Sequence, residues 1–274
     1  MLKYRVITGA VGVPLVILAI WLGDPWPWFT LLIAAAGLAG TYEFYKMASF
    51  NRREPLLYLG LLCSLALVLS PHYRSHNVLP IVITATILIS LICLLCRPSK
   101  EGAFRNWAWA IVGALYVGWM LSHWLSLRGL EDGRNWVYLA ILTTFANDTG
   151  AFFIGRSRGK RKLAPAISEG KTLEGAIGGL ACAILCAIVI AMVLNFISLK
   201  LGPPFAFKYW QIMLLGFFVS LFAQLGDLVE SLLKRNMGVK ESGNLLPGHG
   251  GILDRFDSLI FVGAVVYYYV IWVV

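Results

Sequence analysis

Residues 173–198 read LEGAIGGLACAILCAIVIAMVLNFIS, and this stretch decides the fold. Glu174 is its one charged residue. A bilayer core about 30 Å thick needs about 20 predominantly apolar residues in a helix, and this stretch is long enough to supply them. It therefore predicts a helix that crosses a membrane.

The composition of the whole chain agrees with this prediction. Of its 274 residues, 59% are hydrophobic and 14% are charged, and the mean hydropathy is +0.75. A soluble domain has about 25% charged residues, so this chain lacks the polar surface that would cover a core in water. The composition excludes a water-soluble globular enzyme.

Nine stretches along the chain have the length and apolarity of a membrane span. They are approximately residues 6–22, 26–47, 56–70, 78–96, 107–127, 136–154, 173–198, 210–233 and 252–274. We expect an all-α, polytopic integral membrane protein, in which residues 1–274 form a single transmembrane domain of about nine helices. The longest polar segments, 155–171 and 234–251, both lie in the C-terminal half, about 140–274, where we look for function.

The basic residues sort by side when the nine stretches are threaded through a membrane. Of the 23 Lys and Arg residues, 18 fall on the side of the N-terminus and five on the other. Because cytoplasmic loops carry an excess of Lys and Arg, we expect a cytoplasmic N-terminus, an outer C-terminus and location in the cytoplasmic (inner) membrane. This asymmetry also explains the net charge of +9, so we expect no nucleic acid as partner.

Carboxylates gather at the predicted cytoplasmic ends of the last two spans. Asp227, Glu230 and Lys234 fall on one face of a helix, together with Ser231, and Asp254 and Asp257 repeat the i, i+3 spacing on the next span. Converging carboxylates need a proton or a cation between them, and oxygen ligands favour Mg²⁺, Mn²⁺ or Ca²⁺. The alternative is a set of carboxylates paired with neighbouring basic residues, without a metal.

The segment between these two spans is rich in glycine. Residues 240–251 read KESGNLLPGHGG, with four glycines and a lone histidine, His249, just before the last span. Glycines let backbone N–H groups approach an anionic ligand closely, and a following helix N-terminus favours phosphate. A lone histidine is also a common structural hydrogen bonder, so its role stays open at this point.

The other polar segment carries a basic run, GRSRGKRKL at 155–163, followed by SEGKTLEG at 168–175. Gly170-Lys171-Thr172 resembles the end of a P-loop, but Pro165 stands where the first glycine is required, and we expect no strand here in a helical membrane chain. The basic run is either a topology signal that contacts anionic lipid or, beside a cation site, a clamp for phosphate groups.

Several motifs together resemble the phosphatidate cytidylyltransferase (CDP-diacylglycerol synthase) family. They are SLLKR at 231–235, KESGNLLPGHGGILDRFD at 240–257, NDTGAF at 147–152, Gly155-Arg156 and the 168–175 segment. The likeness covers the C-terminal half, and the N-terminal spans match only in length, number and the opening LKYR. It implies transfer of a cytidylyl group from CTP to phosphatidic acid in a bilayer, with Mg²⁺ required, catalytic loops facing the cytoplasm, and a homodimer; a second cation stays open.

The resemblance also implies a role for each matching residue. Asp227 and Asp254 would bind the metal, with three further carboxylates nearby: Asp148, Asp257 and Glu230. The cationic side chains that face the CTP or lipid phosphates would be Lys234, Arg235, His249 and Arg255. The remaining substrate-binding set would comprise Lys171, Thr172, Arg156, Lys160, Lys240, Gly250 and Gly251.

Two departures from the family pattern leave alternatives open. Glu241 stands where the family usually has Asp, and Glu169-Gly170 where it usually has a proline before the Lys-Thr pair. One alternative is a related CTP-dependent transferase that acts on an isoprenoid lipid. Another is an ion-coupled transporter, although the acidic residues cluster at one membrane face and not at the midplane where transport sites usually lie.

Overall fold

A computed structural model describes residues 2–23, 25–50, 54–73, 77–95, 101–201, 204–245, 248 and 250–274, with the backbone alone for 2–9. The chain divides into two compact units. The first comprises Met1–Ser126 and Asn236–Phe256, and the second comprises Leu127–Arg235 and Asp257–Val274. Each unit is described by itself.

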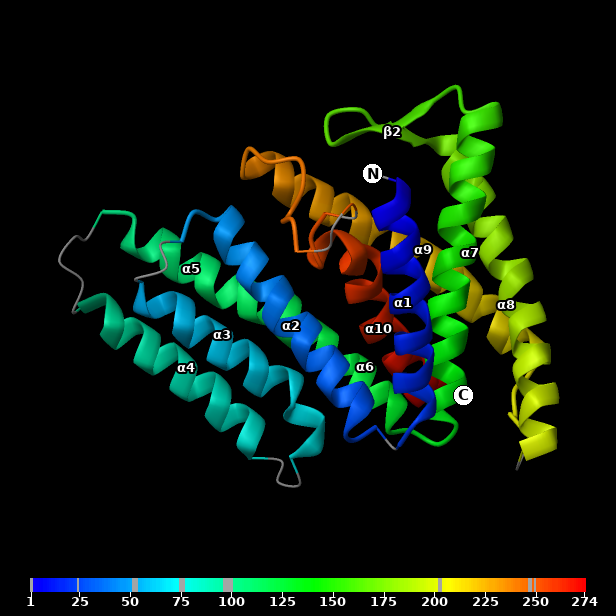
Figure 1. The fold of residues 1–274 in the computed structure, drawn as a ribbon, viewed down its shortest axis with the longest axis horizontal. Coiled ribbons are helices and arrows are strands. Elements are labelled where there is room, and N and C mark those ends of the chain that lie inside the picture. The colour runs from blue at the N-terminus through cyan, green and yellow to red at the C-terminus, as the bar shows by residue number, and fades with distance from the viewer. Residues whose placement is uncertain are drawn as a thin grey trace. The chain divides into compact units, whose positions relative to one another are not determined.

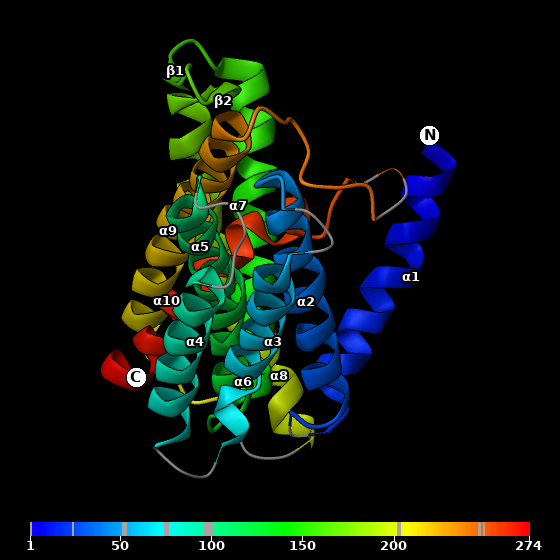
Figure 2. The same ribbon diagram turned by 90° about the vertical axis from the view of Figure 1, so that its left-hand side faces the viewer.

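The first unit consists of helices. These are α1 (Leu2–Trp21), α2 (Trp28–Met47), α3 (Pro55–Val68), the short η1 (Ser70–His72), α4 (Val78–Leu95), α5 (Ala103–Gly113), the π-helical turn η2 (Ala114–Trp119) and the first part of α6 (Met120–Arg128). α3 lies between α2, α4 and α5, as both ribbon views show (Figure 1, Figure 2). Glycines permit these close approaches: a Cβ at Gly37 would lie 2.8 Å from Val68.

The second unit contains α7 (Gly133–Arg158), β1 (Lys162–Ala164), β2 (Ser168–Thr172), α8 (Leu173–Leu201), α9 (Tyr209–Asn236) and most of α10 (Leu253–Val273). α7 and α8 run side by side and are joined at one end by the β1–β2 hairpin (Figure 1). Gly178 and Gly179 of α8 lie against Ile154 and Asn147 of α7. α9 is tied to α10 by the Gln211 side chain, which donates to the Val273 carbonyl at 2.8 Å.

Each of the nine apolar stretches coincides with helix in the described residues. The ends differ by a few residues, most at α7, which continues to Arg158. Among the residues that the structure describes, six helical segments are long and apolar enough to cross a membrane, namely Val78–Leu95, Ala103–Arg128, Gly133–Arg158, Leu173–Leu201, Tyr209–Asn236 and Leu253–Val273. The chain is thus an α-helical protein of the multi-span membrane type, and a count of nine spans stays a prediction.

The β1–β2 hairpin corrects the expectation that no strand lies before residue 173. Its strands pair antiparallel, with Lys162 opposite Thr172 and Ala164 opposite Ser168. This segment is polar and largely exposed, so its backbone is free to pair outside the apolar helices. Lys171 and Thr172 belong to the strand itself and not to a loop after a strand, so the structure offers no P-loop here.

Candidate active site

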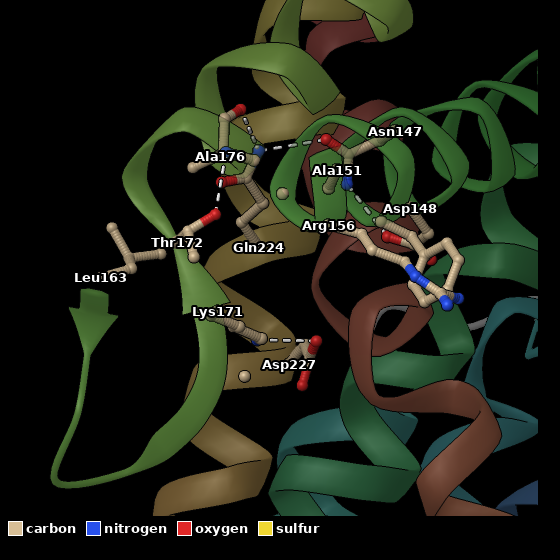
Figure 3. A pocket seen from close by; sticks show the side chains of 14 residues that line it. Asn147, Asp148, Ala151, Arg156, Leu163, Lys171, Thr172, Ala176, Gln224 and Asp227 are labelled. Carbon is tan, nitrogen blue, oxygen red and sulfur yellow. Dashed lines mark hydrogen bonds and ion pairs between the residues drawn. The ribbon is translucent and has the colours of Figure 1, made fainter. Parts of the chain in front are cut away.

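A cavity of about 490 Å³ opens in the second unit where α7, the hairpin, α8 and α9 meet (Figure 3). These elements bring together residues that lie up to 80 positions apart in the sequence. The lining residues are Asn147, Asp148, Ala151, Phe152, Gly155, Arg156, Leu163, Gly170, Lys171, Thr172, Gly175, Ala176, Gln224 and Asp227. Five predicted site residues are among them: Asp148, Arg156, Lys171, Thr172 and Asp227.

An ion pair crosses this cavity. The Lys171 ammonium from β2 lies 2.6 Å from the Asp227 carboxylate of α9, and both side chains are partly exposed. Figure 3 shows the two side chains pointing toward each other across the cavity. Ser231, one turn further along α9, also donates to Asp227 at 3.4 Å. The pair joins the hairpin to α9 and places a cation and an anion in direct reach of a ligand.

The start of α8 forms one wall of the cavity. The Thr172 hydroxyl accepts a hydrogen bond from the Gly175 N–H at 3.1 Å, as an N-capping residue does. Glu174 in the same turn accepts from the backbone N–H groups of Lys160 at 3.0 Å and Arg161 at 3.1 Å, which fixes the base of the hairpin. The positive end of the α8 dipole and Lys171 therefore lie on the same side of the cavity and suit an anionic ligand.

A buried amide network forms the inner end of the cavity, and the sequence reasoning missed it. The Asn147 side-chain oxygen accepts from the Ser220 hydroxyl at 2.6 Å and from the Gln224 amide at 3.1 Å. The Asn147 amide donates to Asp148 at 3.0 Å, and Gln224 also donates to the Ala176 carbonyl at 3.1 Å. Amide side chains inside otherwise apolar stretches were the signal that could have found it.

Three acidic side chains of the second unit act on one another electrostatically. The charges of Asp227 and Asp148 both affect the Asp257 carboxyl near the start of α10. Gly226 allows α9 and α10 to approach closely here, since a Cβ at this position would lie 2.7 Å from the Asp257 carbonyl oxygen. Within the described ranges, no three Cys, His, Asp or Glu side chains gather as a metal-binding group. The side chains of these three aspartates nevertheless offer carboxylate oxygens, which are the ligand atoms that Mg²⁺ prefers.

Asp257 and four other predicted residues of the second unit do not line the cavity. Glu230 is fully buried and lies 3.2 Å from the Lys234 ammonium one turn along α9. Arg235 is exposed, and its guanidinium donates to the Ile167 carbonyl of the hairpin at 3.4 Å. Lys160 is exposed at the hairpin base. The Arg235 bond connects α9 to the hairpin, whereas the Glu230–Lys234 pair lies within α9.

The glycine-rich loop belongs to the first unit. Asp254 Oδ2 accepts hydrogen bonds from the Ser242 N–H, the Ser242 hydroxyl and the Gly251 N–H, each at 2.9 Å. Gly250 has a φ of +80°, a conformation that favours glycine. Lys240 lines a second cavity of about 390 Å³ at this loop, and Arg255 is exposed. His249 lies outside the described residues.

A buried carboxylate beneath this loop was also missed as a site residue. Glu43 of α2 is 4% exposed and accepts hydrogen bonds from the loop and from the start of α10. The sequence places it 199 residues before Ser242, so no local pattern links the two.

Comparison with known proteins places the chain in a family. The profile of the cytidylyltransferase family matches residues 3–273. A phosphatidate cytidylyltransferase of Bacillus subtilis is 34% identical, and the match covers 97% of each chain. Proteins of the same name from Staphylococcus haemolyticus and Staphylococcus epidermidis are 34% and 36% identical, with 95–96% and 85–86% of the chains covered. The chain therefore belongs to the cytidylyltransferase family.

Proposed function

We propose that the protein transfers the cytidylyl group of CTP to phosphatidic acid and releases CDP-diacylglycerol and pyrophosphate. The observation that carries this proposal is the cavity in which Lys171 and Asp227 meet beside the N-terminus of α8. It combines positive charge for phosphates with carboxylates for a cation, and relatives of similar length carry the name phosphatidate cytidylyltransferase.

The reaction needs positioning more than proton transfer. An oxygen of the lipid phosphate attacks the α-phosphorus of CTP, a P–O bond forms there, and the bond to the β-phosphate breaks so that pyrophosphate leaves. The phosphate nucleophile is already anionic near neutral pH, so no strong base is required. Lys171 and Arg156 neutralise phosphate charge and hold the reacting groups in line, which is the main source of rate in phosphoryl transfer.

Mg²⁺ is part of the proposal. Asp227, Asp148 and Asp257 would hold it in the second unit, and Asp254 is the further ligand that the sequence predicts. When bound, the ion would offset negative charge that develops on the leaving pyrophosphate.

The rim of the cavity suits a lipid substrate. Phe152 lines the cavity and is 57% exposed, and its ring contacts that of Phe153, which is 64% exposed. The basic run of residues 156–162 begins at the end of α7 and leads into the hairpin, and its positive charge suits a phosphate headgroup. An acceptor with an anionic head and apolar tails matches both surfaces. We further propose that this site faces the cytoplasm and that the enzyme is a homodimer.

A matched pair of variants tests the assignment of Asp227. Purified protein in detergent is given CTP and phosphatidic acid, with and without Mg²⁺, and CDP-lipid and pyrophosphate are measured. We expect metal-dependent product, and we expect Asp227→Asn to lower kcat/KM by about 100-fold or more, because the charge is lost at the reacting phosphates.

The control is Asp132→Asn, at the opposite end of α7 and outside the cavity lining. It makes the same chemical change and is expected to keep wild-type kinetics. Equal losses in the two variants would contradict the role of Asp227. Product from an isoprenoid phosphate but not from phosphatidic acid would contradict the proposed acceptor.

A further inference from the structure

We infer that Glu43 is a positioning residue that holds the glycine-rich loop and, through Ser242, orients Asp254. The inference rests on the proposed function, in which this loop and Asp254 serve the cytidylyl transfer. It concerns contacts within the first unit only.

Both oxygens of the buried Glu43 carboxylate are engaged by the loop side. Oε1 accepts a hydrogen bond from the Ile252 N–H at 3.1 Å, and Oε2 accepts from the Leu253 N–H at 2.9 Å. The Ser242 hydroxyl lies 3.2 Å from Oε2. The first N–H groups of a helix have no hydrogen-bond acceptor within the helix. At the start of α10 the Glu43 side chain of α2 provides the acceptors. Two backbone N–H groups thus satisfy one oxygen each of the buried carboxylate, and the Ser242 hydroxyl can add a bond to Oε2 when it does not donate to Asp254.

The Glu43 carboxylate leaves no space for a side chain at two of the loop glycines. A Cβ at Gly243 would lie 2.5 Å from Glu43 Oε1, and a Cβ at Gly251 would lie even closer to Oε2. Side chains at these positions would therefore displace either the loop or Glu43. Gly251, one of the glycines predicted to bring a backbone N–H group to an anionic ligand, donates its N–H to Asp254, an anion of the protein itself.

Ser242 connects Glu43 to Asp254. Its hydroxyl lies within hydrogen-bond distance of Glu43 Oε2 and of Asp254 Oδ2, at 3.2 Å and 2.9 Å. The Ser242 and Gly251 N–H groups donate to the same Asp254 oxygen, Oδ2. The two N–H groups set the orientation of the Asp254 carboxylate. The single hydroxyl hydrogen of Ser242 can be donated to Asp254 or to Glu43, so the position of Ser242 depends on both carboxylates.

The start of α10 is consequently occupied by carboxylates. The N–H groups of Gly251, Ile252 and Leu253 donate to Asp254 or Glu43. Glu43 therefore contributes by fixing the loop and not by touching substrate.

The test compares Glu43→Gln with Thr41→Val in the full-length protein in detergent. Gln keeps the size of Glu but turns one acceptor into a donor that faces backbone N–H groups. Thr41 lies on the same helix, is equally buried, and bonds Ser64 of α3 at 2.7 Å without touching the loop. Hydrogen–deuterium exchange of residues 240–254, thermal unfolding and steady-state kinetics are measured for both.

We expect Glu43→Gln to raise deuterium uptake across 240–254 and to lower kcat by about 10- to 100-fold with a smaller change in the KM for phosphatidic acid, because the loop is displaced and the lipid site is not. Thr41→Val is expected to lower the unfolding temperature while keeping loop exchange and kcat. Because Ser242 mediates the effect, Ser242→Ala and Glu43→Gln together should cost little more than the worse single variant.

Three results would overturn the inference: unchanged loop exchange in Glu43→Gln, equal loss of kcat in Thr41→Val, or strictly additive effects of the Ser242 and Glu43 changes. Loop exchange is measured without turnover. A wild-type protein that makes no CDP-lipid would therefore contradict the proposed function, while the exchange data would still decide whether Glu43 holds the loop.

Discussion

Two side-chain amides, those of Asn147 and Gln224, tie three helices together. Asn147 lies on α7, its partners Ser220 and Gln224 lie on α9, and Gln224 reaches the Ala176 carbonyl on α8. Asn147 is 1% exposed, so these bonds form where water cannot replace them. A polar group left unpaired in such a place costs about 1–3 kcal/mol.

Asn147→Ala is therefore expected to lower the free energy of unfolding by about 1–3 kcal/mol, because the Ser220 hydroxyl and the Gln224 amide lose their shared acceptor. Thermal unfolding in detergent measures the change. Ser157→Ala removes an exposed hydroxyl from the same helix and is expected to stay within about 0.5 kcal/mol of wild type. Indistinguishable unfolding of the two variants would show that the network contributes nothing to stability.

The pairing of α7 with α8 depends on the absence of side chains at a few positions. A Cβ at Gly179 would lie 2.8 Å from the Asn147 side-chain oxygen and 2.9 Å from its backbone oxygen. A Cβ at Gly150 of α7 would lie 2.6 Å from Cys182 of α8. Small residues at helix contacts let backbones approach closely in membrane proteins, and here that approach brings the two helical walls of the cavity together.

Gly179→Ala is expected to destabilise the protein by about 1–3 kcal/mol, because a methyl group would collide with backbone that cannot move aside cheaply. Gly12→Ala in α1 is the matched control, since a Cβ there meets nothing within 4 Å. It should be neutral or stabilise by up to about 1 kcal/mol, the difference in helix propensity. Denaturation midpoints compare the two, and an equal response would argue against tight packing at Gly179.

The distribution of basic residues along the chain predicts how the whole molecule is oriented in the membrane. The basic residues lie on one side if the nine helical stretches cross the membrane in turn, with 18 of 23 on the side of the N-terminus. Loops rich in Lys and Arg are found mainly on the cytoplasmic side of a membrane. This asymmetry therefore predicts a cytoplasmic N-terminus.

Reporter fusions measure the orientation directly. A reporter active only in the cytoplasm should work at the N-terminus and fail at the C-terminus, and a reporter active only outside should behave in the opposite way. Equal behaviour at both ends would require an even number of spans. Light scattering of the purified protein in detergent is expected to give the mass of two chains, and the mass of one chain would contradict the proposed homodimer.

The sequence predicts the helices well because each one depends on its own apolar residues. Residues 78–96 and 173–198 illustrate this, since their helices, Val78–Leu95 and Leu173–Leu201, begin at the predicted residues. The hairpin was missed because its pairing follows from exposure of the backbone and not from hydrophobic pattern. Lys171 and Asp227 were each predicted as site residues, but their ion pair and the role of Glu43 depend on contacts between distant segments, which periodicity does not encode.

The cavity of the second unit also has an order of assembly. All of its lining residues except Gln224 and Asp227 belong to residues 147–176, so they are synthesised before α9. Contacts between neighbours in the chain form early, because they close short loops. A nascent chain that ends after α8 already carries Lys171 and Arg156, and synthesis of α9 then delivers the carboxylate that balances Lys171. The Lys171–Asp227 ion pair thus becomes possible once α9 has been translated, whereas the carboxylate of Asp257 arrives only with α10.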